Sequence, residues 1–199
     1  MSKSIIYLIL VVLGLFFVMG GCSTYNGLVD KDENVEQAWG NVQSAYQRRA
    51  DLVPQLVATV KGAAEFEKST ITAVTEARAK ASSITIDPSN ITPEQLQQFQ
   101  QAQSGLTSSL SRLLATFERY PELKATDNFK QLQAQLEGTE NRIKVERDKF
   151  NGVVTTYNKA VRRFPAAIFA GIFGFSKKAQ FESDAGAEDA PEVNFDFSN

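Results

Sequence analysis

The chain contains no histidine and only one cysteine, Cys22, so it lacks side chains on which much enzyme and metal chemistry depends. Without histidine there is no imidazole base for a nucleophile and no imidazole ligand for zinc or haem. A single cysteine excludes an internal disulfide. The net charge is −2 with basic and acidic residues interleaved, so no basic stripe predicts nucleic-acid binding. We therefore expect a protein that is not an enzyme and holds neither metal nor cofactor.

Cys22 directly follows an apolar run, Ile5–Met19. As a helix this run is about 22 Å long, which is short for a hydrocarbon core of about 30 Å and typical of an export signal. Met19-Gly20-Gly21-Cys22 resembles a bacterial lipobox, in which the signal is cut before a cysteine whose sulfur takes a diacylglycerol. Met19 is a departure, since a branched aliphatic residue is usual there. The alternative is an uncleaved signal-anchor, and in both cases Lys3 stays cytoplasmic and the rest faces outward.

Beyond this segment, strand alternation is absent and apolar residues recur at helical spacing. The first stretch begins near Asp32, and Pro54 predicts that it either ends near Arg49 or kinks there. Proline is accepted in the first turn of a helix, so a second stretch could open at Pro54 and fade near Ala81.

Two further helices have clear start signals. Thr92-Pro93-Glu94-Gln95 predicts a capping box, and the helix it opens stops at Tyr120-Pro121. Its glutamine-rich stretch, residues 97–103, is interpreted as a solvated face. Thr126 or Asp127 can cap the last helix, which Pro165 follows.

These stretches predict an all-α fold, an up-and-down antiparallel four-helix bundle. The expected organisation is a signal peptide or signal-anchor at 1–21, a tether at 22–30, the helical-bundle domain at 31–175 and an acidic flexible tail at 176–199. The heptad spacing also permits a coiled-coil homo-oligomer.

Charged residues near Pro54 and in the last helix are the candidate polar site. A bundle would bring the two regions together, and we interpret the group as a structural network that fixes helix register. Glu137 and Glu140 share a helix face, so acid–base work is a minor alternative without a nucleophile beside it. The network residues are Arg48, Arg49, Asp51, Glu137, Glu140 and Arg142.

An apolar run after Pro165, residues 164–175, is too short to span a membrane. It either packs on the end of the bundle or contacts a membrane or a partner. The residues expected to make that contact are Ile168, Phe169, Ile172, Phe173 and Phe175.

Three blocks of sequence resemble the LemA family. They are residues 25–67, with Tyr46-Gln47-Arg48-Arg49-Ala50-Asp51-Leu52-Val53-Pro54; residues 118–143, with Glu118-Arg119-Tyr120-Pro121; and residues 147–175, with Phe169-Ala170-Gly171-Ile172-Phe173-Gly174-Phe175. The resemblance implies a membrane-tethered helical bundle with an outward-facing domain, and it implies no catalytic residues.

We therefore expect a scaffold or adaptor in the bacterial cell envelope, anchored by its N-terminus, with its domain on the extracytoplasmic side. Its partners would be the membrane and an envelope protein. The alternative function is lipid binding or membrane shaping through residues 164–175. In either case Cys22 is the predicted lipidation site.

Overall fold

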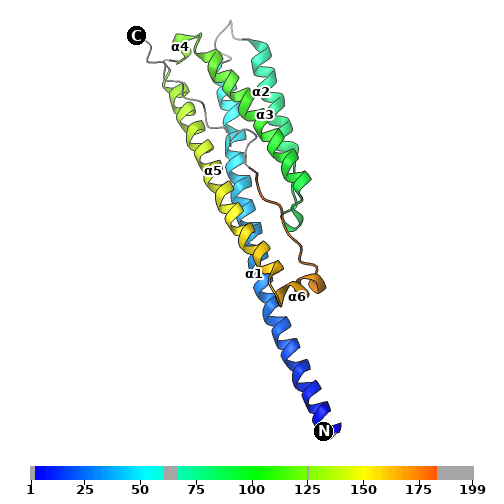
Figure 1. The fold of residues 1–199 in the computed structure, drawn as a ribbon. Coiled ribbons are helices and arrows are strands. Elements are labelled where there is room, and N and C mark those ends of the chain that lie inside the picture. The colour runs from blue at the N-terminus through cyan, green and yellow to red at the C-terminus, as the bar shows by residue number, and fades with distance from the viewer. Residues whose placement is uncertain (1–2, 61–66, 125, 183–199) are drawn as a thin grey trace, which may run out of the picture.

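Helices supply all the regular secondary structure in the part of the chain that the structure describes, residues 3–60, 67–124 and 126–182. Figure 1 shows long helices lying side by side, with the N-terminal part of α1 extending beyond the others. The all-α prediction is confirmed over these residues. In this computed structural model the elements are α1 (Lys3–Val60), α2 (Lys68–Ser83), the 3₁₀ turn η1 (Pro88–Asn90), α3 (Pro93–Phe117), α4 (Pro121–Lys124), α5 (Asp127–Arg162) and α6 (Ala166–Phe173).

Helix α1 is longer than the sequence predicts. It runs without interruption from Lys3 to Val60, so residues 22–30 are helical and do not form a tether. Leu28 is buried within this stretch and Gly21 is buried just before it, so these residues have packing that a solvated tether would lack. Of the two alternatives predicted near Arg49, an end or a kink, the end is wrong, because the helix continues through Pro54.

Pro54 is accommodated inside α1 by a side chain from another helix. Proline has no N–H, so the carbonyl of Ala50 loses its usual helical donor. Arg78 of α2 donates its Nε–H to that carbonyl oxygen at 2.8 Å. Ala50 is buried, where an unpaired carbonyl would be costly. Consequently α2 begins at Lys68 and not at Pro54, and it ends at Ser83, close to the expected Ala81.

The predicted starts of the two later helices are confirmed. Thr92 accepts a hydrogen bond from the Gln95 backbone and Gln95 accepts one from the Thr92 backbone, which completes the capping box of α3. Thr126 caps α5 by accepting from the Phe129 backbone at 3.4 Å. Helix α5 ends at Arg162, as Pro165 predicts.

Two apolar clusters hold the helices together. One surrounds Trp39 of α1, whose ring lies 5.4 Å from that of Phe99 in α3 and 5.5 Å from that of Phe150 in α5. The other includes residues of α1, α2, α3 and α5, such as Leu113 and Phe129. The pairing of Trp39 with Phe150, and of Arg49 with Glu140 further along α1, shows that α1 and α5 run antiparallel.

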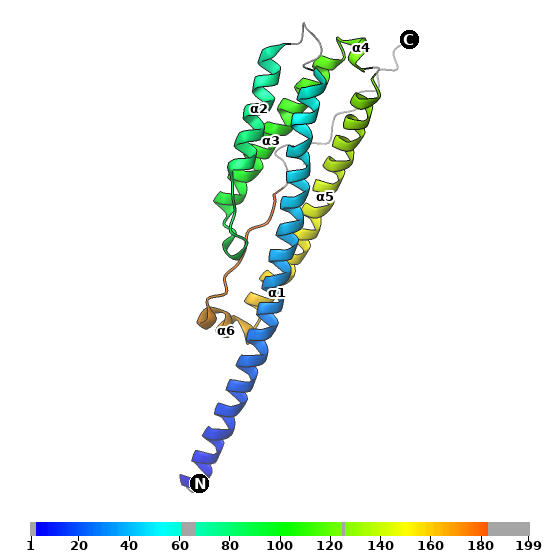
Figure 2. The ribbon, with the colours of Figure 1, turned by 180° about the vertical axis from the view of Figure 1, so that it is seen from behind.

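A short extended segment after α6, residues 175–182, returns along the helices. Lys178 and Phe181 are buried, and the Phe181 ring stacks on Trp39 at 6.0 Å. The predicted flexible tail therefore needs correction for residues 176–182, which contact α5 through Asn151 and Asn158 and α1 through Trp39; the rest of that prediction falls outside the described residues. Figure 2, seen from behind, shows this segment leading away from α6, which lies against α1 at the base of the other helices.

Among the residues whose backbone and side chains the structure describes, no helix combines the length and the apolar character needed to cross a membrane.

Candidate functional site

Arg49 is the centre of a polar network that connects four helices. Its Nη1 donates to Thr107 Oγ1 at 2.6 Å and to Glu140 Oε1 at 2.8 Å. Its Nη2 donates to the side-chain oxygen of Gln103 at 2.7 Å and to the Gln103 carbonyl at 3.2 Å. Gln103 in turn donates to the carbonyl of Ala81 at the end of α2 at 3.3 Å. We call Arg49, Gln103, Thr107 and Glu140 the Arg49 network.

The side chains of the Arg49 network are engaged with one another by hydrogen bonds and one ion pair. The Arg49 side chain is 2% exposed, and both terminal nitrogens of its guanidinium donate hydrogen bonds. The Glu140 carboxylate is bound to that guanidinium and is 39% exposed. The Thr107 hydroxyl accepts from Arg49 and donates to the Gln103 carbonyl at 3.2 Å, so these contacts fix the helices relative to one another.

The other predicted network residues lie elsewhere on the surface. Arg48 and Arg142 line an open groove between α1 and α5 and do not contact Arg49 through any hydrogen bond or ion pair found in the described chain. Asp51 accepts from Gln47 one turn earlier, and Glu137 accepts from Gln133 in the same way. Of the six residues, the structure thus joins Arg49 to Glu140 and places Arg48 and Arg142 in one groove, while Asp51 and Glu137 accept hydrogen bonds from residues of their own helices.

Sequence reasoning missed Gln103 and Glu146. The glutamine-rich stretch predicts a solvated face that includes Gln103, but Gln103 is 7% exposed and accepts from Arg49. Glu146 lies on the apolar side of α5, with Arg142 Nε at 2.9 Å and Lys149 Nζ at 3.2 Å from its Oε1. Its position one turn from Ile143 and Phe150 was the available signal. Within residues 3–60, 67–124 and 126–182, no group of three His, Cys, Asp or Glu side chains could hold a metal.

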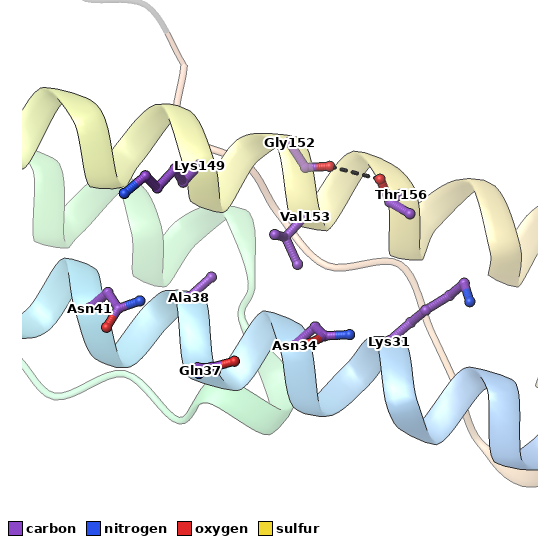
Figure 3. A pocket seen from close by; sticks show the side chains of 9 residues that line it. All are labelled: Lys31, Asn34, Gln37, Ala38, Asn41, Lys149, Gly152, Val153 and Thr156. Atoms are coloured by element: carbon purple, nitrogen blue, oxygen red, sulfur yellow. Dashed lines mark hydrogen bonds between the residues drawn. The ribbon is translucent and has the colours of Figure 1, made fainter.

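A groove of about 540 Å³ lies between the exposed faces of α1 and α5. Figure 3 shows Asn41 of α1 across the groove from Lys149 of α5, and Asn34 of α1 nearer Val153 and Thr156. The lining also includes two lysines, one from each helix, and no carboxylate. It therefore presents many hydrogen-bond donors over a small apolar floor. The full lining is Lys31, Asn34, Gln37, Ala38, Asn41, Lys149, Gly152, Val153 and Thr156.

Helix α6 packs one face on α1 and leaves the other exposed. Phe169 is buried against Gly21, where an added Cβ would lie 3.0 Å from the ring carbon Cε1. Tyr25 of α1 contacts the Phe173 ring at 4.9 Å and the Phe175 ring at 5.9 Å. Exposed apolar side chains on α6 and next to it are Phe164 (83%), Ile172 (64%), Ile168 (48%) and Phe173 (45%). Of the residues predicted to contact a membrane or a partner, Phe169 and Phe175 thus pack on α1, whereas Ile168, Ile172 and Phe173 are exposed.

Two asparagines of α5 hold the extended segment by its main chain. Asn158 donates to the Lys178 carbonyl at 2.9 Å and accepts from the Lys178 N–H at 3.0 Å. Asn151 makes the same pair of bonds to Phe181, both at 2.9 Å. Seven residues along a helix, from Asn151 to Asn158, cover about the same distance as three residues along an extended segment, from Lys178 to Phe181. This arrangement explains why residues 178–181 are ordered without a helix of their own.

Lys178 and Tyr157 form a small buried group beside this segment. Lys178 Nζ forms an ion pair with Asp32, donates to the Pro88 carbonyl at 3.0 Å and lies 5.3 Å from the centre of the Tyr157 ring. Burial of the Tyr157 hydroxyl, together with the negative charge of Asp32, raises its pKa to about 12. Tyr157 therefore stays neutral at physiological pH.

Cys22 is exposed on α1, one residue after the contact between Gly21 and Phe169. Its sulfur is therefore accessible to modification.

Comparison with known proteins identifies relatives of most of the chain. A model described as the LemA family matches residues 38–195. A curated Protein LemA of Metamycoplasma hominis is 26% identical over 160 residues, covering 80% of this chain and 68% of that protein. Magnetosome protein MamQ of Magnetospirillum gryphiswaldense is 34% identical over 90 residues, covering 45% of this chain. MamQ 2 of Paramagnetospirillum magneticum is 33% identical over the same length. The match spans a third of the length of each MamQ relative.

Proposed function

Since the chain belongs to the LemA family, we propose that it is a membrane-anchored, outward-facing helical-bundle scaffold or adaptor. Relatives named for the magnetosome and for LemA support a membrane-associated bacterial protein. The observation that carries the finer proposal is the uncovered groove between α1 and α5, which offers a partner a long, preformed surface.

The anchor is the N-terminal part of α1. Lys3 before the apolar run favours an orientation with the helical body outside the cytoplasm, on the periplasmic or extracytoplasmic side. In a lipoprotein, cleavage before Cys22 would leave an acylated cysteine as the first residue; in an uncleaved anchor, residues 5–19 would remain. Mass spectrometry of the purified N-terminus distinguishes the two, because only the lipoprotein begins with a diacylglyceryl-modified Cys22.

The partner that fits the groove is an amphipathic helix with carboxylates on its flanks. Lys31 and Lys149 lie on opposite walls, and Val153 provides an apolar floor; Glu146, which pairs with Lys149 at 3.2 Å, lies outside the lining. A photo-crosslinker at Asn34 or Asn41 of the full chain should react with one envelope protein in membranes. The same crosslinker at Gln97, an exposed residue of α3, is the matched control.

Charge reversal tests this docking mode. Lys31→Glu/Lys149→Glu should reduce the crosslinking yield at Asn41, because the acidic flank of the partner would then be repelled. Equal yields from Asn41 and Gln97, or a yield unaffected by the charge reversal, would contradict the adaptor proposal. The proposal includes no catalytic step, so Glu137→Gln/Glu140→Gln should complement a deletion strain fully.

A second function, lipid binding through residues 164–175, is favoured by one observation. Ile168, Ile172 and Phe173 on α6 leave large apolar surfaces exposed next to the still more exposed Phe164. Short amphipathic helices of this kind lie in the membrane interface with their apolar face buried. Exposure of Ile172 to lipid, measured with a label on that residue, is the direct test.

A further inference from the structure

A basic groove of about 570 Å³ lies where α5 ends and the extended segment leaves α6. Arg162 and Arg163 approach it from the end of α5, Lys159 from one turn earlier, and Lys177 from the segment that follows α6. The remaining lining residues are uncharged except Lys178, and no carboxylate is among them. The full lining is Pro93, Thr155, Asn158, Lys159, Arg162, Arg163, Lys177, Lys178, Ala179 and Gln180.

Four of these cations have no counter-ion in the described chain. Lys178 is neutralised by Asp32, but no ion pair there involves Lys159, Arg162, Arg163 or Lys177. The carbonyls at the C-terminus of α5 offset only about half of one positive charge. Among the described residues, several positive charges at the groove are therefore left uncompensated, and two of them are guanidinium groups suited to phosphate oxygens.

The groove lies beside the apolar surface of α6. Phe164 follows Arg163 directly, and Lys177 comes four residues after Phe173, so cations flank the exposed apolar side chains at both ends of α6. Gly174 ends the helix with a φ of 80°, and the Phe175 N–H bonds back to the Ala170 carbonyl at 2.9 Å. This combination of an apolar helix face with a cationic border is typical of elements that lie in a bilayer interface.

Both forms of the proposed anchor would place a membrane surface at the level of α6. Phe169 of α6 contacts Gly21, one residue before Cys22 and two after Met19. At 1.5 Å per helical residue, the end of the apolar run and the cysteine both lie within about 5 Å along α1 from this contact. Figure 1 shows α6 at the point where α1 leaves the other helices.

We propose that the basic groove binds the phosphate of an anionic phospholipid headgroup while the exposed face of α6 lies in the same bilayer leaflet. The inference rests on the proposed membrane anchoring and adds its ligand class. Arg162, Arg163, Lys159 and Lys177 neutralise the headgroup, and Phe164, Ile168 and Ile172 contact its acyl chains. The helical body is thereby held at a fixed orientation to the surface by two contacts, α1 and α6.

The test uses the full chain carrying Cys22→Ser and Ile172→Cys, with a polarity-sensitive nitrobenzoxadiazole label on the new cysteine. The protein is reconstituted into vesicles of phosphatidylcholine alone or of phosphatidylcholine with phosphatidylglycerol. Co-flotation reports anchoring, and label emission and access of a soluble quencher report burial of α6. We expect a blue-shifted, protected label only in the phosphatidylglycerol vesicles.

Charge variants test whether the basic groove causes the burial of α6 in the bilayer. Each removed cation should shift the equilibrium between lipid-buried and water-exposed α6 about fivefold, so Arg162→Gln/Arg163→Gln should shift it about twenty-five-fold. Lys159→Gln/Lys177→Gln should do the same from the other wall. Lys130→Gln/Lys144→Gln, which removes two exposed cations elsewhere on α5, should leave the label protected.

The outcomes separate the alternatives. A label that is protected equally in both vesicles, or that is indifferent to the groove variants, overturns the headgroup site while anchoring stands. Reversal of protection by millimolar inorganic phosphate at constant ionic strength assigns the groove to free phosphate and overturns the lipid assignment. Failure of the chain to float with either vesicle overturns the proposed anchoring and this inference with it.

Discussion

The bond between Arg78 and the Ala50 carbonyl predicts energetic coupling between Arg78 and Pro54, although the two side chains lie on different helices. Arg78→Met removes a charge-assisted hydrogen bond to a buried carbonyl that has no helical donor. The expected loss in the free energy of unfolding is about 1.5–3 kcal/mol. Pro54→Ala restores the N–H at residue 54 and should stabilise the protein by about 1–3 kcal/mol.

The double variant decides whether this reasoning is correct. With alanine at residue 54 the Ala50 carbonyl has its helical donor, so Arg78→Met should then cost less than about 0.5 kcal/mol. The coupling energy from the four proteins should therefore exceed about 1 kcal/mol. Urea unfolding followed by far-UV circular dichroism and by the fluorescence of Trp39, the sole tryptophan, measures it. If the effects of Pro54→Ala and Arg78→Met on the free energy of unfolding are additive, Arg78 does not replace the missing donor of Pro54. An equal loss of stability from the exposed control Arg112→Met would refute the reasoning in the same way.

Three further predictions concern other buried groups. Arg49→Met should cost about 3–5 kcal/mol in urea unfolding because its buried acceptors lose their donor, whereas Glu140→Gln should cost less than about 1 kcal/mol because that side chain is partly solvated. Phe181→Ala should cost about 3 kcal/mol and shift Trp39 emission to the red, and an unshifted spectrum would contradict the stacking. The pKa of Tyr157 is near 10 in the unfolded chain but about 12 in the folded chain, so its contribution to stability is constant below pH 10 and is lost between these values, by at most about 3 kcal/mol; Tyr157→Phe should flatten that decline.

Helix starts were predictable from sequence because their causes are local. Thr92 and Gln95 satisfy each other's backbone within one turn, and Thr126 does the same for Phe129, so neighbouring residues contain all the information. The end of α5 before Pro165 has an equally local cause.

The continuity of α1 was not predictable, because its cause is distant. Proline at residue 54 removes a hydrogen bond, and the replacement comes from a side chain 28 residues from Ala50 in the sequence. Gln103 shows the same limit: a glutamine within a polar run is indistinguishable from its neighbours until Arg49 of another helix reaches it. The pairing of Arg49 with Glu140 was among the expected contacts, since antiparallel first and last helices bring these regions together.

The order in residues 178–181 has a different cause. Asn151 and Asn158 recognise main-chain N–H and C=O groups, which every residue except proline provides, so the bound segment needs no periodic pattern. Only Lys178 and Phe181 contribute buried side chains. The acidic composition of the tail predicted disorder here, because composition contains no information about main-chain hydrogen bonds to Asn151 and Asn158.

The docking of this segment also determines how α6 can act. Helix α6 is fixed on one side by its connection to α5 and on the other by Lys178, whose backbone is bound to Asn158 and whose ammonium group pairs with Asp32 of α1. Phe169 holds the middle of the helix against Gly21. The exposed apolar side chains thus lie on a short helix that is restrained at both ends and in the middle. Binding to a surface therefore costs this segment less conformational entropy than it would cost a free loop. Asn158→Ala should release one restraint, and if the face acts as a unit, label burial at residue 172 should weaken although no exposed residue of α6 has changed.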